Sequence, residues 1–394
     1  MKRFICLCLL ICGLAACSPK SENTETQSTA VENDKEILFI GTYTLKEGHV
    51  DGKGEGVYVY EMDKATGEIT YVSTAEGVIS PSYLAVHPNG EWVYAVNEFN
   101  GGNDEFATVT ALNYDAQTKS LSFLSESGTL GQYPCHVSID NSGNFVMAAN
   151  YVGGSVLLYP IAEDGAVTES SSYRKHEGGS DHPRQEAAHA HQIVQYPGKD
   201  WVFAVDLGAN KVYEYKLDTL SMTLDAVAEH DMIPKASGPR HMAFHPQKPF
   251  AYLLNELIGT VEVFPLSDEA RFDRSIQVIS TMAVGDDRLA HSAAIKVHPS
   301  GKFLYVTNRN DVNDIVSYAI AEDGTLSETG RSSTQGLIPR DFGIDPSGKF
   351  LLVANQNSDS IITFRINAET GALEETGFVA EVPTPVCVKF LNGE

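Results

Sequence analysis

The sequence is poor in cysteine once its first residues are set aside. Four of its 6 cysteines lie within the first 17 residues, and only Cys135 and Cys387 follow. Two cysteines cannot form a disulfide framework. They also stand at the starts of expected inner strands in different repeats, so we expect them to remain free thiols.

Basic residues are also scarce. The chain has 28 Lys and Arg residues against 52 Asp and Glu residues, which gives a formal net charge of -24. Nucleic-acid binding needs a basic surface that can replace the counterions of the phosphates. We therefore expect no nucleic-acid partner, and arginines that gather near strand ends become candidates for a functional site.

The sequence has no apolar run long enough to span a membrane as a mature helix. Basic residues at 1–3 precede a short apolar run at 4–11, as in a cleavable export signal. The segment Leu14-Ala15-Ala16-Cys17 resembles a bacterial lipobox. We predict a lipoprotein signal peptide over 1–16, then a lipidated Cys17 and a flexible tether over 17–35. An ordinary signal peptide with an incidental cysteine is the alternative.

These features predict a protein of the cell envelope, on the periplasmic or outer-membrane side, attached to the membrane only through the lipid. The tether is rich in Ser, Thr, Glu and Asn and has almost no apolar residues, a composition typical of a disordered linker.

The segment Gly238 to Glu256 is the clearest example of a recurring unit. Its pattern predicts a strand, a tight turn at His245-Pro246 and a returning strand. In an antiparallel hairpin of regular register, Arg240 would lie opposite Asn255 and beside Glu256. One end of the hairpin would then carry both a guanidinium and a carboxylate.

This unit recurs along the whole chain. The ends of the returning strands are spaced by 47 to 56 residues, and they are Asn97, Asn150, Asp206, Asn255, Asn308 and Asn355. A strand-rich repeat of this length is typical of a β-propeller blade. Residues 36–44 and 384–390 resemble the two missing halves of one more blade. We therefore predict an all-β domain over 36–394, a seven-bladed β-propeller closed by pairing of the N- and C-terminal strands.

One segment interrupts the repeat. Residues 174–190 form an insertion between the third and fourth repeats, and long ordered insertions are commonly functional. We expect it to end at the channel side of the fourth repeat. Its polar residues are His176, Asp181, His182, Arg184, Gln185, Glu186 and His189.

Several short motifs occur in a specific order. They are Gly-Thr-Tyr-Thr at 41–44, Pro-Cys-His-Val at 134–137, Arg-Gln-Glu-x-x-His-x-His-Gln at 184–192, Asp-Leu-Gly at 206–208, Gly-Pro-Arg-His at 238–241 and Asn-Gln at 355–356. With this combination, residues 36–394 resemble the seven-bladed propeller lactonases, a family that includes the propeller-type 6-phosphogluconolactonases and a muconate-lactonising enzyme. The resemblance implies a lactone or anionic sugar derivative as substrate and no cofactor.

The resemblance also implies a set of catalytic residues, namely His191, Arg240, Glu256 and Arg309. Further candidates for binding the substrate are His136, Arg184, His189, His241 and Arg340. The arginines would hold an oxyanion, a carboxylate or a phosphate. Either Glu256 or His191 would take a proton from water, and a neighbouring histidine would return one to the leaving oxygen. The sequence has no Gly-x-Ser-x-Gly motif, which argues against a covalent serine intermediate.

Other interpretations remain open at this point. Arg240 and Glu256 can form a purely structural ion pair. His182, His189 and His191 offer a weak zinc pattern, although we predict no metal. A lactonising lyase would use the same groups in the reverse direction, and a binding propeller would have the same channel without turnover. The phosphorylated lactone of sugar metabolism is made inside the cell, which conflicts with export. We expect the protein to be a monomer.

Overall fold

The computed structural model describes residues 34–48, 50–100, 107–267, 271–272 and 274–393. The predicted signal peptide, Cys17 and all but the last two residues of the predicted tether lie outside these ranges. Residues 34–394 form one compact unit. In the part of the chain that the structure describes, no helix has the length and apolar character needed to cross a membrane.

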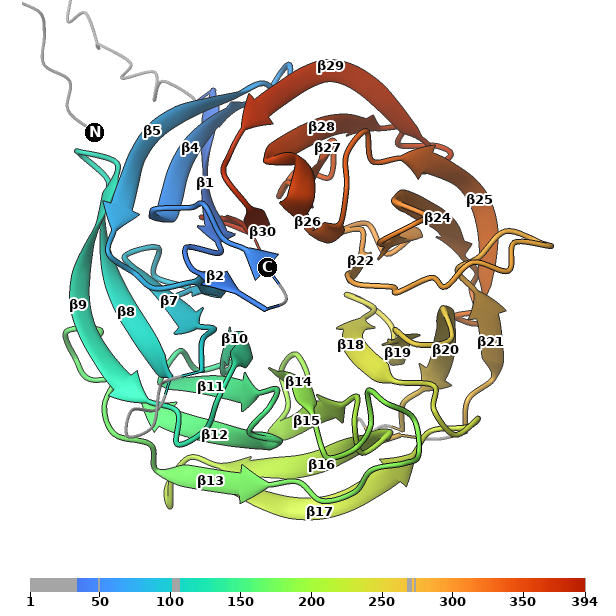
Figure 1. Ribbon diagram of the computed structural model, residues 1–394, viewed down its shortest axis with the longest axis horizontal. Coiled ribbons are helices and arrows are strands. Elements are labelled where there is room, and N and C mark those ends of the chain that lie inside the picture. Colours follow the sequence, from blue (N-terminus) through green and yellow to red (C-terminus); the bar gives the residue numbers. More distant parts are fainter. Residues whose placement is uncertain (1–33, 49, 101–106, 268–270, 273, 394) are drawn as a thin grey trace, which may run out of the picture. The chain divides into compact units, whose positions relative to one another are not determined.

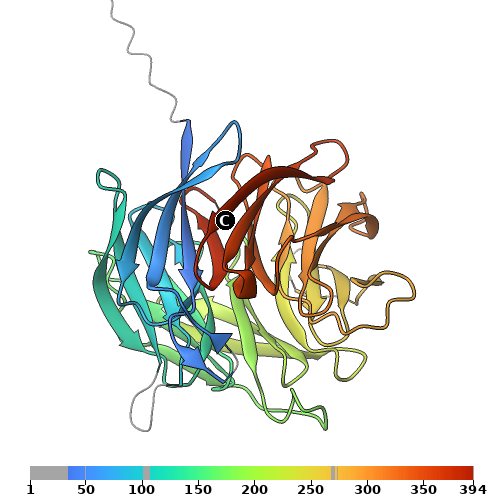
Figure 2. The ribbon, with the colours of Figure 1, turned by 45° about the horizontal axis from the view of Figure 1, so that its top comes forward.

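Seven four-stranded antiparallel sheets are arranged in a ring around a central axis (Figure 1, Figure 2). We call the space along this axis, which the innermost strands face, the channel. Blade 1 combines both ends of the described chain and contains β30 (Pro385–Phe390), β1 (Lys35–Thr42), β4 (Gly56–Asp63) and β5 (Ile69–Glu76). Blade 2 contains β6 (Pro81–Val86), β7 (Trp92–Asn97), β8 (Thr108–Asp115) and β9 (Ser120–Gly128). Blade 3 contains β10 (Pro134–Ile139), β11 (Phe145–Asn150), β12 (Ser155–Pro160) and β13 (Ser172–Lys175).

The remaining blades follow the same order from the centre outward. Blade 4 contains β14 (Ala190–Gln195), β15 (Trp201–Asp206), β16 (Lys211–Asp218) and β17 (Thr223–Asp231). Blade 5 contains β18 (Pro239–Phe244), β19 (Phe250–Asn255), β20 (Thr260–Pro265) and β21 (Gln277–Ser280). Blade 6 contains β22 (Ile295–Val297), β23 (Phe303–Asn308), β24 (Asp314–Ile320) and β25 (Leu326–Ser333). Blade 7 contains β26 (Pro339–Ile344), β27 (Phe350–Asn355), the 3-10 turn η1 (Gln356–Ser358), β28 (Ser360–Ile366) and β29 (Leu373–Glu381).

The ring closes by pairing of the two ends of the chain, as predicted. β30 lies antiparallel to β1, with Val388 opposite Ile40 and Phe390 opposite Leu38. β30 supplies the innermost strand of blade 1, so the ring has no open sheet edge at the junction. A small hairpin of β2 (Lys46–Glu47) and β3 (Val50–Asp51) follows β1 and extends toward the centre of the ring in Figure 1.

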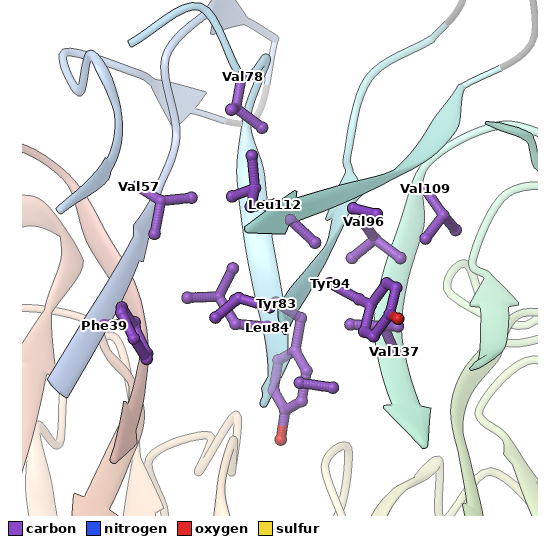
Figure 3. Close-up of a cluster of buried hydrophobic side chains, with 14 of the residues drawn as sticks. Phe39, Val57, Val78, Tyr83, Leu84, Tyr94, Val96, Val109, Leu112 and Val137 are labelled. Atoms are coloured by element: carbon purple, nitrogen blue, oxygen red, sulfur yellow. The ribbon is translucent and has the colours of Figure 1, made fainter. Parts of the chain in front are cut away.

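The hydrophobic core lies between neighbouring blades. Figure 3 shows one part of it, where Phe39 and Val57 of blade 1 face Leu84 and Leu112 of blade 2. All four side chains are completely buried. Burying one such side chain contributes about 1.5–3 kcal/mol, so packing between blades holds the ring together.

Polar residues join neighbouring repeats. His87 Nε2 donates to the carbonyl of Gly143 at 2.8 Å, and His298 Nε2 donates to the carbonyl of Gly348 at 2.8 Å, so these turn histidines link adjacent blades. Asn150 caps a neighbouring loop by donating from Nδ2 to the carbonyl of Thr129 at 2.8 Å. Buried backbone carbonyls need such partners.

The predicted register of the central hairpin is wrong at Arg240. Pro239, not Arg240, lies opposite Asn255, and His241 lies opposite Leu254. Arg240 is therefore the extra residue of a β-bulge. A bulge bends its strand and redirects the unpaired side chain, and the left-handed conformation of Gly238, with φ of 66°, precedes it.

The same bulge occurs at the start of the innermost strand in most blades. The extra residues are Ser82, Cys135, His191, Arg240, Arg340 and Val386. This repeated irregularity gives each of these six blades one residue at the same end of the channel. It therefore brings side chains from distant parts of the sequence to one place.

Candidate active site

A second set of equivalent positions lies beside the bulges. Each member directly follows the second strand of its blade, and the set is Tyr43, Glu98, Tyr151, Leu207, Glu256, Arg309 and Gln356. The backbone N–H of Glu256 donates to the carbonyl of Gly238 at 2.7 Å, and Arg309 and Tyr151 make the equivalent bond in their blades. These bonds hold the second set next to the bulges, and together the two sets form the mouth of the channel.

Glu256 lies at the centre of the mouth. Its Oε2 is 3.0 Å from Arg240 Nε, and its Oε1 is 2.9 Å from Arg309 Nη2 and 3.1 Å from Arg184 Nη1. Arg240 also donates through Nη1 to the carbonyl of Ala293, and Arg309 donates through Nε to the carbonyl of His291 at 2.9 Å. One carboxylate therefore holds three guanidiniums.

The cluster is largely removed from water. Glu256 is 1% exposed and Arg240 is 2% exposed. Burial alone would raise the pKa of Glu256, but the charges of Arg309, Arg240 and Arg184 outweigh burial and lower that pKa to about 2. Burial and the nearby Arg309 lower the pKa of Arg240 to about 10. At neutral pH both groups are charged.

The insertion between blades 3 and 4 brings Arg184 to Glu256. His176 fixes its beginning, because Nδ1 lies 2.8 Å from Asp206 Oδ2 and Nε2 lies 2.9 Å from Tyr215 Oη. Gln185, completely buried, donates from Nε2 to the carbonyl of Leu207 at 2.7 Å. The insertion is thus anchored on blade 4 on both sides of its exposed segment.

Tyr151 supports this arrangement from blade 3. Its hydroxyl accepts hydrogen bonds from Arg184 Nε at 3.3 Å and from Nη2 at 3.0 Å. The ring of Tyr151 stacks on His189 at 4.5 Å, and the edge of His191 faces it at 5.5 Å. His189 is bound to the carbonyl of Tyr151 and to Glu186, so it lies behind Tyr151 rather than beside Glu256.

Arg340 forms a second ion pair at the mouth. Its Nη2 lies 3.4 Å from Glu98 Oε2, and its guanidinium lies 5.4 Å from the centre of the Tyr43 ring. The mouth therefore contains four arginines against two glutamates. This local excess of positive charge, in a chain of net charge -24, favours an anionic ligand.

His191 lies beside Cys135, another member of the bulge set. The Sγ of Cys135 is 3.7 Å from His191 Nδ1, and the ring of His191 lies 5.1 Å from that of His241. Burial lowers the pKa of His191 well below its usual value, and the positive charge of Arg240 lowers it further. Burial raises the pKa of the Cys135 thiol. At neutral pH the imidazole is therefore uncharged and the thiol protonated.

Three aromatic rings from different blades meet below the mouth. The ring of His136 lies 4.4 Å from Tyr83 and 5.6 Å from His241, and Tyr83 lies 5.9 Å from His241. They come from blades 3, 2 and 5, so they meet across the ring. In Figure 3 the ring of Tyr83 extends beyond the aliphatic side chains, with its hydroxyl at the far end. We call these three residues the aromatic plug.

The geometry groups most of the predicted site residues. Arg184, Arg240, Glu256 and Arg309 are in contact, Arg340 and His191 line the same mouth, and His136 and His241 lie beneath it. His189 is the exception. Within the described ranges, no group of three or more His, Cys, Asp or Glu side chains is arranged to hold a metal ion.

Sequence reasoning missed the aromatic part of the site. Tyr43, Tyr83 and Tyr151 were not among the candidates, although Tyr43 and Tyr151 occupy the same position after the second strand as Glu256. The repeat alignment contained this signal. These tyrosines are neutral, so a search for charged residues and histidines does not reveal them.

Comparison with known proteins defines the class of protein. The family model of the lactonases, described as a seven-bladed β-propeller, matches residues 37–390. The 6-phosphogluconolactonase of Bacillus subtilis is 36% identical over 360 residues, which covers 91% of this chain and 99% of that protein. The 6-phosphogluconolactonase of Formosa agariphila is 32% identical over 78% of this chain and 86% of its own length.

A solved structure agrees with these matches. The periplasmic gluconolactonase of Pseudomonas aeruginosa superimposes with a TM-score of 0.83 at 32% identity, covering 90% of this chain and 99% of that one. The chain therefore belongs to the seven-bladed β-propeller lactonase family. This membership confirms the predicted fold and the predicted class of enzyme, a lactone hydrolase.

Proposed function

We propose that this protein hydrolyses the lactone of an aldonic acid at the mouth formed by Glu256 and its arginines. The observation that carries the proposal is the buried contact of Glu256 with Arg240 and Arg309, at 3.0 and 2.9 Å. A preorganised cluster of guanidiniums in a site removed from water stabilises a developing oxyanion better than water does.

Arg240 and Arg309 take the role of oxyanion holders. Each guanidinium has five N–H donors, and the contacts with Glu256 and with backbone carbonyls use only some of them. The remaining donors bind the carbonyl oxygen of the lactone as it becomes negative. Glu256 fixes the two arginines in place, since both of its carboxylate oxygens contact guanidiniums.

His191 takes the role of general base. Its lowered pKa keeps the imidazole unprotonated at neutral pH, so it accepts a proton from water as the water oxygen bonds to the carbonyl carbon. The bond between that carbon and the ring oxygen then breaks. The leaving alkoxide takes back the proton from the imidazolium, which gives the open hydroxy acid.

The other candidates bind and orient the substrate. Arg184 and Arg340 lie at the outer part of the mouth, where they can bind a phosphate or carboxylate of the sugar. His136 and His241 form the floor beneath the lactone, and His189 positions Tyr151, which in turn supports Arg184.

Export is part of the proposal. We propose that residues 1–16 are removed as a signal peptide and that Cys17 carries lipid, so that the 17–35 tether holds the propeller in the cell envelope. The named location of the Pseudomonas aeruginosa relative, the periplasm, supports such a place. An unphosphorylated gluconolactone outside the cytoplasm would resolve the conflict between export and an intracellular phosphorylated substrate. We propose that the protein is a monomer.

The test is product analysis. The purified protein is incubated with gluconolactone, with 6-phosphogluconolactone and with an unsaturated dicarboxylate, and the products are followed by NMR. We expect ring opening of at least one aldonolactone above the uncatalysed rate. Lactonisation of the dicarboxylate without lactone hydrolysis would show that the protein is a lactonising lyase instead. No turnover of any compound would favour a propeller that binds its ligand without catalysis.

A further inference from the structure

Blades 2 and 5 have the same backbone arrangement at the mouth. In both blades the extra residue of the innermost strand directly follows a proline, and it is Ser82 in blade 2 and Arg240 in blade 5. In both, a glutamate follows the second strand, and its N–H donates to the carbonyl two residues before the bulge, at 2.9 Å for Glu98 and 2.7 Å for Glu256. Ser82 and Glu98 are therefore equivalent to Arg240 and Glu256.

The side chain beside the carboxylate differs between the two blades. In blade 5 a guanidinium lies next to it, since Arg240 Nε is 3.0 Å from Glu256 Oε2. In blade 2 the equivalent residue is Ser82, which is shorter and uncharged. The bulge of blade 2 therefore offers Glu98 no cation.

The cation that contacts Glu98 comes from blade 7. Arg340 Nη2 lies 3.5 Å from Glu98 Oε1 and 3.4 Å from Oε2, and the guanidinium lies 5.4 Å from the centre of the Tyr43 ring of blade 1. The contacts of Glu256 with its three arginines are shorter, at 2.9 to 3.1 Å. Glu98 is thus held more loosely than Glu256.

Glu98 can accept further hydrogen bonds. A carboxylate has about four lone-pair positions. Arg340 uses part of this capacity, and Tyr43 uses another part: burial raises the pKa of Tyr43, the charge of Arg340 lowers it, and Glu98 raises it through its charge and a hydrogen bond. The Glu98 side chain is 7% exposed against 1% for Glu256, so Glu98 is the more accessible carboxylate of the mouth.

Ser82 adds a polar atom without a protein partner. Its hydroxyl oxygen is buried and has no hydrogen-bond partner among the described residues, and the residue is 2% exposed. A buried polar atom without a partner is rare in native proteins, so a ligand or a water is expected there. A serine hydroxyl both donates and accepts, which suits it to bind another hydroxyl group.

We propose that Glu98 and Ser82 bind hydroxyl groups of the sugar lactone and make the enzyme selective for polyhydroxylated lactones. This selectivity rests on the proposed hydrolysis of an aldonolactone at the mouth. Three arginines surround Glu256, which leaves a net positive charge for the lactone carbonyl, whereas Arg340 and Glu98 balance each other. The carbonyl therefore faces blades 5 and 6, and the hydroxyl groups face blade 2.

The selectivity follows from the hydrogen bonds that these groups form. A hydroxyl that donates to a carboxylate makes a charge-assisted hydrogen bond, which is about twice as strong as a neutral one. A lactone without hydroxyl groups leaves the oxygens of Glu98 and Ser82 unpaired, and a site built to bind hydroxyls discriminates against such an analogue. Glu98 and Ser82 are thus specificity-determining residues.

The test compares kcat/KM for gluconolactone with that for δ-valerolactone, a six-membered lactone without hydroxyl groups. We define the selectivity as the ratio of the two values. Glu98→Gln keeps the shape and loses the charge-assisted bond, so we expect this ratio to fall at least about tenfold, mainly through the KM for gluconolactone. Glu322→Gln is the matched control, because that carboxylate is exposed and pairs with Lys248. Equal losses on both lactones would overturn the proposal.

A second variant leaves the ion pair of Arg340 with Glu98 in place. Ser82→Ala removes only a hydroxyl that bonds to no described residue, so its melting temperature should match that of the wild type. We expect the selectivity of Ser82→Ala to fall at least about threefold. A wild-type ratio in Ser82→Ala would refute the role of Ser82, and a wild-type ratio in both variants would refute the whole proposal.

A binding measurement separates this proposal from the proposed function. The compound 1,5-anhydroglucitol has the hydroxyl groups of the sugar ring but no lactone carbonyl, so its affinity, measured by NMR titration, does not depend on turnover. We expect Glu98→Gln to bind it at least about tenfold more weakly than the wild type and Glu322→Gln do. If this difference appears although no lactone is hydrolysed, the proposed function fails and hydroxyl recognition by Glu98 stands. Equal affinity in Glu98→Gln and the wild type, or no binding to the wild type, would refute that recognition.

Discussion

Glu256 Oε1 and Arg309 Nη2 lie 2.9 Å apart, although the two residues belong to adjacent blades and Glu256 is 1% exposed. The same carboxylate contacts Arg240 in its own blade and Arg184 in the insertion. A single buried anion therefore joins blades 5 and 6 to the segment that covers the mouth. Its removal affects both the stability of the ring and the geometry of the site.

Replacement of Glu256 by glutamine is expected to destabilise the protein at neutral pH. The variant leaves Arg240 and Arg309 buried without a counter-charge, and breaking a buried pair in this way costs about 3–5 kcal/mol. Urea unfolding at pH 7, followed by circular dichroism, measures the change in the free energy of unfolding. Glu322→Gln is the matched control, since that carboxylate is exposed and its pair with Lys248 contributes little.

The pH dependence of stability tests whether the charge of Glu256 causes the destabilisation of Glu256→Gln. The folded-state pKa of about 2 lies below the ordinary value of 4.5, so this contribution to stability is fully present above pH 4.5 and is lost as the pH falls toward 2. The difference in stability between wild type and Glu256→Gln should narrow over that range. A difference that stays constant from pH 7 to pH 3 would show that the charge of Glu256 is not the cause.

The pH dependence of lactone hydrolysis is expected to reflect a buried imidazole. Burial and the charges of Arg240, Arg340 and Arg309 all lower the pKa of His191, so kcat/KM should stay flat through pH 6.5 and fall only at lower pH. Stopped-flow assays with a pH indicator measure the profile. His191→Asn should lose this acid limb together with about 100-fold or more of the rate, whereas a limb centred near pH 6.5 would exclude His191 as the base.

Because β30 closes the ring, we predict that truncation of the C-terminus strongly destabilises the fold. A chain that ends at Glu381 lacks β30, which exposes the inner edge of β1 and removes Val388 and Phe390 from the core between blades 1 and 7. We expect this chain to lose its cooperative thermal transition. Deletion of residues 18–33 is the control and should leave the melting temperature unchanged; a truncated chain that melts like the wild type would contradict closure.

The predicted anchor is tested by replacing Cys17. In Cys17→Ser the lipid cannot be attached, so the protein should appear in the soluble fraction of the cell envelope rather than with the membranes. Fractionation with immunoblotting measures the distribution. A wild-type protein that already fractionates with the soluble proteins, as Cys17→Ser does, would favour the alternative of an ordinary signal peptide with an incidental cysteine.

The fold was predictable because the sequence repeats it. The spacing of Asn97, Asn150 and their equivalents reports the length of a blade, and the unpaired strands at 36–44 and 384–390 report the closure of the ring. The same spacing placed Glu256 and Arg309 at equivalent strand ends. Periodicity of this kind is a property of the sequence itself and requires no knowledge of packing.

The details of the site were harder to predict from the sequence. A bulge shifts the register by one residue, and no feature of the Gly238 to Glu256 segment revealed that Arg240 rather than Asn255 lacks a partner. The aromatic plug was equally hidden, since Tyr83 and His241 meet across the ring from blades 2 and 5. Contacts of this kind depend on where the chain closes in space, which local patterns do not encode.

The most direct test of the account is the kcat/KM for aldonolactone hydrolysis by the wild type, by Arg309→Met and by Arg331→Met. Arg309 contacts Glu256 at the mouth, whereas Arg331 pairs with Glu328 and Asp314 away from it, so the two variants remove the same charge from different places. The account predicts that Arg309→Met loses about 100-fold or more in kcat/KM, the amount expected for one oxyanion donor, while Arg331→Met stays within about threefold of the wild type. Equal activity of the two variants, with both folded, would contradict catalysis at the mouth.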